Sequence, residues 1–130
     1  MISAVLKNEN DYIEIRKVST IDDSIEIEII AKSSFIQIDF STYIFISSLK
    51  EFCKKITETQ EKLSGKIVDH YFNYEEDFKI DIEYFTGGHA VVNAFFKSLT
   101  EFGNKCYLSF ATDQTFINKF LIELKQMINS

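Results

Sequence analysis

Apolar and polar residues alternate with a period of two along the first third of the chain. The stretches 12–18, 25–29 and 36–41 place isoleucine, valine or phenylalanine at alternate positions, with mostly polar side chains between them. Such alternation is typical of a strand that has one face on the core and the other in water. The sequence therefore predicts three antiparallel strands here, with residues 1–6 forming either a short edge strand or a loose end.

The period then changes to that of a helix. The apolar positions that fall on one helical face are Leu49, Phe52, Cys53, Ile56 and Leu63. Ser48 and Glu51 have the spacing of a capping box, and Gly65 stands where a helix stops. We therefore expect an amphipathic helix over residues 47–63, with its charged face in solvent.

Short periods return after Gly65. The stretches that predict further strands are 66–72, 78–84, 89–97 and 106–110, with an acidic turn at 73–77. The last of these strands leads directly into a second amphipathic segment, 113–129, for which Thr112 or Asp113 supplies the N-cap. The helical pattern in this segment is the sharpest local signal in the sequence.

Together these elements predict one α+β domain that spans residues 1–130. The expected architecture is a twisted, largely antiparallel sheet of about six to seven strands, with the two helices, 47–63 and 113–129, packed on one face. Cys53 and Cys106 both lie in apolar patterns, which favours buried thiols over a disulfide.

The net negative charge of the chain favours some classes of binding partner over others. The chain carries 20 acidic and 14 basic residues, a net charge of −6, and such a protein repels phosphate backbones and anionic lipid headgroups. Nucleic acid and membranes are therefore poor partners, whereas a basic protein is a good one. No apolar run approaches the about 20 residues that span a bilayer, and residues 1–15 do not have the pattern of a signal peptide. We therefore expect a cytoplasmic protein.

Candidate catalytic groups are few. His70 and His89 are the only histidines; if their strands were neighbours, Asp69 or Glu75 could join them around a metal ion, but no pair has close ligand spacing. Cys53 lies on an apolar helical stripe, which keeps a thiol protonated. The sequence thus predicts no enzyme, no metal and no cofactor.

Two groups of side chains suggest a surface for a partner. If the strand phases are right, a set of carboxylates points away from the isoleucines: Glu26, Glu28, Asp39, Asp81 and Glu83. A second set places aromatic rings beside carboxylates, a combination common at interfaces: Tyr71, Tyr74, Glu75, Glu76 and Asp77. A solvated sheet face is the simpler explanation of the first set. The functional hypothesis is an acidic surface that captures a cationic partner.

Three stretches, 44–65, 88–93 and above all 108–124, resemble the WapI family of bacterial immunity proteins. The junction Ala111-Thr112-Asp113-Gln114-Thr115 is similar to the acidic-Thr-Asp-Gln-Thr turn of that family, with Ala111 in place of the acidic residue. The resemblance implies a small cytosolic antidote that occludes a toxin without catalysis. It transfers no toxin contact to a particular residue of this chain.

Two functions remain open at this point. The first is a non-enzymatic immunity protein, monomeric or weakly dimeric, that neutralises a cognate toxin domain, with a basic nuclease as the favoured toxin. The second is a small α+β module that binds an apolar ligand or lipid in a pocket lined by some of the 13 phenylalanines. A filled core with an acidic, aromatic surface would favour the first, and a sizeable internal cavity the second.

Overall fold

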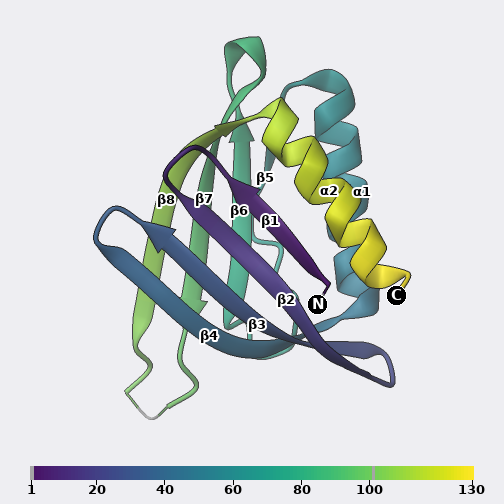
Figure 1. The fold of residues 1–130 in the computed structure, drawn as a ribbon, viewed down its shortest axis with the longest axis vertical. Coiled ribbons are helices and arrows are strands. Elements are labelled where there is room, and N and C mark those ends of the chain that lie inside the picture. Colours follow the sequence, from purple (N-terminus) through teal and green to yellow (C-terminus); the bar gives the residue numbers. More distant parts are fainter. Residues whose placement is uncertain (1, 101) are drawn as a thin grey trace.

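The chain forms two four-stranded antiparallel sheets and two helices, as a computed structural model describes for residues 2–100 and 102–130 (Figure 1). The first sheet has the order β1 (Ser3–Lys7), β2 (Tyr12–Ile21), β3 (Ser24–Ser33) and β4 (Ile36–Phe45). The second has the order β5 (Lys66–Ile67), β6 (Phe78–Tyr84), β7 (His89–Lys97) and β8 (Lys105–Asp113). The helices are α1 (Ile46–Lys62) and α2 (Gln114–Ile128), and a short 3-10 turn, η1 (Thr86–Gly88), joins β6 to β7.

The predicted α+β class and both helices are confirmed, but the single sheet of six to seven strands is wrong. Every strand pair in the structure joins strands that are consecutive in sequence. The chain passes from β4 directly into α1, and α1 carries it away from the first sheet to the place where the second begins (Figure 1). Alternation specifies which face of a strand is buried but does not specify which strands pair with it. The division into two sheets was therefore not visible in the sequence pattern.

The predicted strand over 66–72 is also mostly absent. Lys66–Ile67 forms a two-residue strand on β6, Asp69 then adopts a left-handed backbone conformation with φ 57°, and a single bridge joins Tyr71 to Lys79 of β6. His70 and Phe72 beyond it are buried, and both rings pack against Phe52 of α1. Tertiary packing against the helix therefore replaces the strand.

The two sheets and two helices enclose one apolar core. The inward isoleucines of β3, Ile25, Ile27 and Ile29, and those of β6, Ile80 and Ile82, are at most 1% exposed. The first sheet (purple to blue) crosses the second (teal to green), and the helices lie side by side along one side of the sheets (Figure 1). Because the buried sides of both sheets share one core, their outer faces point in opposite directions.

The start of α1 differs from the predicted capping box. The N-cap is Phe45, whose side chain makes no capping bond, and the amide of Ile46 donates to the carbonyl oxygen of Asp23 (2.8 Å). The Ser48 hydroxyl donates instead to the carbonyl oxygen of Tyr71 (3.0 Å). A backbone contact with the β2–β3 turn thus takes the place of a local cap, and α1 begins before Ser48.

The predicted cap of the second helix is confirmed at Asp113. One oxygen of its carboxylate accepts hydrogen bonds from the amides of Thr115 (2.9 Å) and Phe116 (3.1 Å). We expect Asp113→Ala to lower the free energy of unfolding by about 1 kcal/mol, because two first-turn amides lose their acceptor. Urea unfolding of this variant and of Asp113→Ser, which keeps an acceptor, measures the effect; equal losses in both would contradict a capping role.

Candidate interaction surface

The predicted acidic face is divided between the two sheets. Glu26 and Glu28 lie on β3 and Asp39 on β4, all on the outer face of the first sheet. Asp81 and Glu83 lie on β6, on the outer face of the second sheet. Because these faces point in opposite directions, the five carboxylates cannot bind one partner together. The expectation of a single acidic sheet face is therefore wrong.

On the second sheet, positive charge offsets the carboxylates. Lys79 forms ion pairs with Asp69 (2.9 Å) and Asp81 (3.3 Å), and the ammonium lies 5.5 Å from the centre of the Tyr71 ring. These contacts, with the hydrogen bond to Asp69 foremost, raise the pKa of Lys79 and keep it charged. Tyr71 is half-buried here, and Glu83 lies opposite Lys66 in the β5–β6 register. This face is mixed in charge.

On the first sheet, carboxylates dominate the outer face. Glu26 is exposed, lies opposite Tyr43 of β4 and accepts a hydrogen bond from the Ser19 hydroxyl (2.9 Å). Arg16 is the cation in the middle of the sheet, with Nη2 3.2 Å from Glu14 and Nη1 3.5 Å from Glu28. Its pKa is raised, chiefly by the hydrogen bond to Glu14. One guanidinium therefore serves two carboxylates.

Two hollows lie along this outer face. One, of about 470 Å³, is lined by Tyr12, Ile30 and Asp39 among others. The other, of about 360 Å³, includes Val18, Glu26 and Tyr43. Each combines a tyrosine, an aliphatic side chain and a carboxylate, a set that suits the apolar stem and charged end of a lysine or arginine, and the first is also lined by Lys32.

At one end of the sheet, aromatic rings and a carboxylate form a corner. The Tyr43 hydroxyl donates a short hydrogen bond to the Glu75 carboxylate, which raises the pKa of Tyr43 to about 12. The Phe45 ring lies 5.5 Å from that of Tyr43 and 4.8 Å from that of Tyr74. Tyr74 is nevertheless 87% exposed. We call these four residues, Tyr43, Phe45, Tyr74 and Glu75, the aromatic–acidic corner.

Buried polar contacts fix the loop that carries the corner. Asp77, nominated from the sequence as a surface residue, is 3% exposed. Its carboxylate accepts hydrogen bonds from the Thr42 hydroxyl (2.7 Å) and the Asn73 amide (2.8 Å), and the Asn73 amide also donates to the carbonyl oxygen of Tyr43 (2.9 Å). The nomination of Asp77 as a contact is therefore wrong: it anchors the loop and presents Tyr74, Glu75 and Glu76 to solvent.

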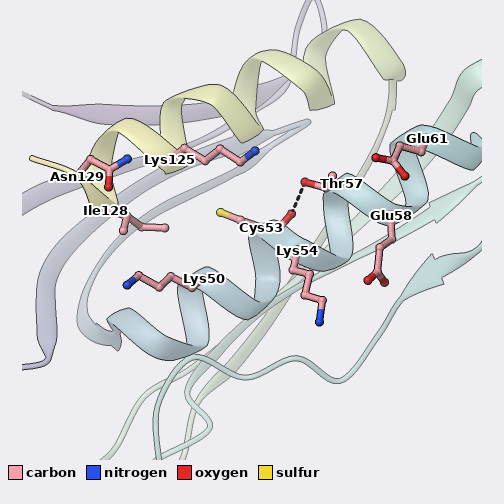
Figure 2. A pocket seen from close by; sticks show the side chains of 9 residues that line it. All are labelled: Lys50, Cys53, Lys54, Thr57, Glu58, Glu61, Lys125, Ile128 and Asn129. Atoms are coloured by element: carbon pink, nitrogen blue, oxygen red, sulfur yellow. Dashed lines mark hydrogen bonds between the residues drawn. The ribbon is translucent and has the colours of Figure 1, made fainter.

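A groove of about 520 Å³ runs between α1 and α2 (Figure 2). Lys125 extends from α2 toward α1, and the sulfur of Cys53 points to the space between the helices, whereas Lys54 and Glu58 point away from α2 (Figure 2). Burial raises the pKa of the Cys53 thiol to about 11, although Lys125 acts in the opposite direction. The thiol is thus protonated at neutral pH, and the groove is mixed in charge because three lysines and two glutamates line it.

The histidines do not meet. His89 is exposed on β7, whereas His70 is buried between Phe52 and Phe72. His70 Nε2 lies 2.9 Å from the carbonyl oxygen of Ser48, and Nδ1 lies 3.0 Å from Lys55 Nζ. Because an ammonium can only donate, Nδ1 is the acceptor and the imidazole is neutral. Within residues 2–100 and 102–130, no three histidine, cysteine or carboxylate side chains are placed to hold a metal ion.

His70 makes stability depend on pH. Burial is the largest cause that lowers its pKa below the usual 6.5. Between these two pKa values, the His70 imidazole is protonated in the unfolded chain but neutral in the folded protein. The free energy of unfolding should therefore fall as pH drops below 6.5 and level off below the folded-state pKa. Urea unfolding between pH 7.5 and 5 should show a smaller fall for His70→Gln, and an unchanged fall for His89→Gln. Equal pH dependence in all three proteins would contradict this role.

Sequence reasoning missed Tyr12, Tyr43 and Phe45. The signal for the last two was present, because the alternation of 36–41 continues to residue 45 and puts Tyr43 and Phe45 in the outward phase of Asp39. The predicted strand ended too early to include them. Tyr12 became a neighbour of Asp39 only through the pairing of β2 and β4 with β3.

Comparison with known proteins gives no match: no protein-family model, curated protein or solved structure is similar to this chain. Of the helices described, none is both long and apolar enough to cross a bilayer. The class that the structure defines is therefore an α+β protein of two antiparallel sheets, with an acidic and aromatic surface on the first.

Proposed function

We propose that the protein is a non-enzymatic immunity protein that binds and neutralises a cognate bacterial toxin domain, a basic nuclease, by occlusion. The contact surface is the outer face of the first sheet together with the aromatic–acidic corner. The observation that carries this proposal is the continuity of this surface: Glu26 lies opposite Tyr43, and Tyr43 is bonded to Glu75. Carboxylates, hollows and anchoring rings thus form one patch, as a tight interface requires.

Charge supports a cationic partner. The carboxylates on the outer face and in the corner loop are Glu14, Glu26, Glu28, Asp39, Glu75 and Glu76, and the cations in the same outward phase are Lys7, Arg16 and Lys32. A surface with such an excess of carboxylates accelerates encounter with a basic protein. A nuclease exposes lysine and arginine side chains that hold phosphates. Carboxylates that form ion pairs with those lysine and arginine side chains block the access of the nucleic acid, and no catalytic step is needed.

The corner suits a stable complex. Tyr74 offers a large exposed ring, and the Phe45 ring packs edge-on against it. Asn73 and Asp77 are buried at either end of the loop, so little conformational freedom is lost when a partner packs on it. The patch therefore combines steering charge with a rigid aromatic anchor.

The small-ligand alternative has less support. The phenylalanines that could line a pocket pack on one another, with ring centroids 5.0 Å apart for Phe52 and Phe72, 5.4 Å for Phe72 and Phe78, and 5.3 Å for Phe78 and Phe96. Their rings fill this part of the core. The groove between α1 and α2 is open to solvent, and lysines and glutamates supply most of its lining.

Co-expression tests the proposal. Tagged protein is produced together with the toxin domain encoded in the neighbouring gene, and growth and complex formation are measured. We expect rescue of growth and recovery of a stoichiometric complex. Recovery of a lipid or small molecule by mass spectrometry, with no toxin bound and no rescue, would reject immunity in favour of a ligand-binding module.

A further inference from the structure

One edge of the first sheet is open. In an antiparallel ladder, successive residues direct their N–H and C=O groups alternately to the two sides of the strand. At the end of β4, the Phe45 amide donates to the carbonyl oxygen of Phe72 (2.9 Å) and the Tyr43 carbonyl accepts from Asn73 (2.9 Å), so both point away from β3. Every second residue of β4 directs its backbone groups to the same side. The N–H and C=O groups of Ser41, Asp39 and Gln37 therefore also point away from β3.

These three residues have free backbone groups. Among residues 2–100 and 102–130, no hydrogen-bond partner lies on the outward N–H or C=O of Gln37, Asp39 or Ser41. Other edges are covered at least in part: the Val5 amide of β1 donates to Glu123 of α2, and the Ser109 carbonyl of β8 accepts from Ser33. The open stretch of β4 is a template for another strand.

The side chains of β4 also lack a neighbour. Ile36, Ile38 and Phe40 face the core but remain half-exposed, whereas the isoleucines of β3 on the same face are buried. The Phe40 ring packs edge-on against Phe96 of the second sheet, with centroids 5.6 Å apart, and β4 crosses in front of β6, β7 and β8 in Figure 1. A strand added beside β4 would cover these apolar side chains on one face.

On its other face, such a strand would meet charge. Asp39 is exposed and points outward, in the same phase as Gln37 and Ser41. Its cross-strand neighbours are Ile30 and, one strand further, Glu14. A segment that fits this edge therefore alternates apolar residues, in phase with Ile38 and Phe40, with basic residues in phase with Asp39.

We propose that the open edge of β4, from Gln37 to Ser41, binds an extended segment of the cationic partner by strand addition. This inference rests on the proposed function for the identity of the partner and deepens it by naming how the toxin domain engages the acidic face. Backbone hydrogen bonds hold the segment, and Asp39 selects basic residues on its outer face.

A defined peptide tests the edge without the toxin. The probe is a blocked peptide of about nine residues that alternates lysine and valine, and its control carries an N-methyl group on every residue, which keeps the charge but removes the donors on both edges of the peptide. We expect the first to bind at least about tenfold more tightly, and NMR hydrogen exchange to show new protection at the amides of Gln37, Asp39 and Ser41. Equal binding of the two peptides would overturn strand addition.

A matched pair of variants tests the same edge in the complex. Ser41→Pro removes the outward N–H and leaves the β3–β4 ladder intact, because proline is accepted on edge strands where the N–H faces solvent. Ser41→Ala removes the same hydroxyl and keeps the N–H. With unfolding curves that show both variants folded, we expect Ser41→Pro to weaken toxin binding at least about tenfold and Ser41→Ala to leave it unchanged.

The outcomes separate the two proposals. If the toxin binds both variants of Ser41 equally, the edge inference fails while the immunity function stands. If the toxin does not bind the unaltered protein but the peptide protects the β4 amides, the toxin as occupant is rejected. Protection of the same amides that grows with protein concentration, without peptide, would assign the edge to a second copy of the chain and overturn the proposed partner.

Discussion

Reversing two carboxylates of the first sheet, in Glu26→Lys with Glu75→Lys, should slow association with a basic toxin domain at least about tenfold at low salt. Glu26 lines one of the hollows, and Glu75 is part of the aromatic–acidic corner. The change removes negative charge at the place where a cationic partner first meets the surface. Stopped-flow association at several salt concentrations should show both a lower rate and a weaker dependence on salt.

Two double variants with the same change in net charge serve as controls. Glu58→Lys with Glu61→Lys alters exposed residues of α1, and Asp81→Lys with Glu83→Lys alters the outer face of the second sheet. We expect both to affect association far less. Equal slowing in all three would mean that net charge alone steers the partner and would remove the first sheet from the account.

Truncation of Phe72 should have the largest effect on stability. Its ring is 1% exposed and lies 5.0 Å from that of Phe52, 5.2 Å from that of His70 and 5.4 Å from that of Phe78. Phe72→Ala therefore leaves a cavity where α1 meets the second sheet, and we expect a loss of about 3–5 kcal/mol in the free energy of unfolding. Equilibrium urea unfolding measures it.

Tyr74→Ala is the matched control, two residues along the same loop. Tyr74 is 87% exposed, so we expect its truncation to change the free energy of unfolding by about 0.5 kcal/mol or less. The same variant should weaken toxin binding, because it removes the exposed ring of the corner. A large loss of stability at Tyr74, or a small one at Phe72, would contradict the packing described for this loop.

Much of the secondary structure was predictable from the sequence, because the alternation of residues 78–84 and the helical spacing of Ile117, Phe120 and Leu124 are both strong. The sequence placed the cap of the second helix at Thr112 or Asp113, and the structure assigns it to Asp113; this much was predictable because a cap depends only on neighbouring residues. The division into two sheets depends on which strands pair. Nothing in the side-chain patterns of β4 and β6 says that these strands belong to different sheets.

The candidate surface was only partly predictable, for the same reason. Glu26 and Glu75 were nominated separately, and their link through Tyr43 exists only because β3 pairs with β4 and the loop folds back on it. Asp77 carries a carboxylate, as its exposed neighbours Glu75 and Glu76 do. It is nevertheless buried, because Thr42 and Asn73 supply its hydrogen bonds. Hydrogen-bond partners that lie far apart in the sequence cannot be predicted from the local side-chain pattern.

Hydrogen exchange of the protein alone and with its toxin domain, read by mass spectrometry, locates the interface. We expect slower exchange in the complex over β3, β4 and the loop of residues 73–77, with β6 to β8 little changed. Protection over β6 to β8 or over the groove between α1 and α2, with β3 and β4 unchanged, would contradict the assignment of the interface to the first sheet.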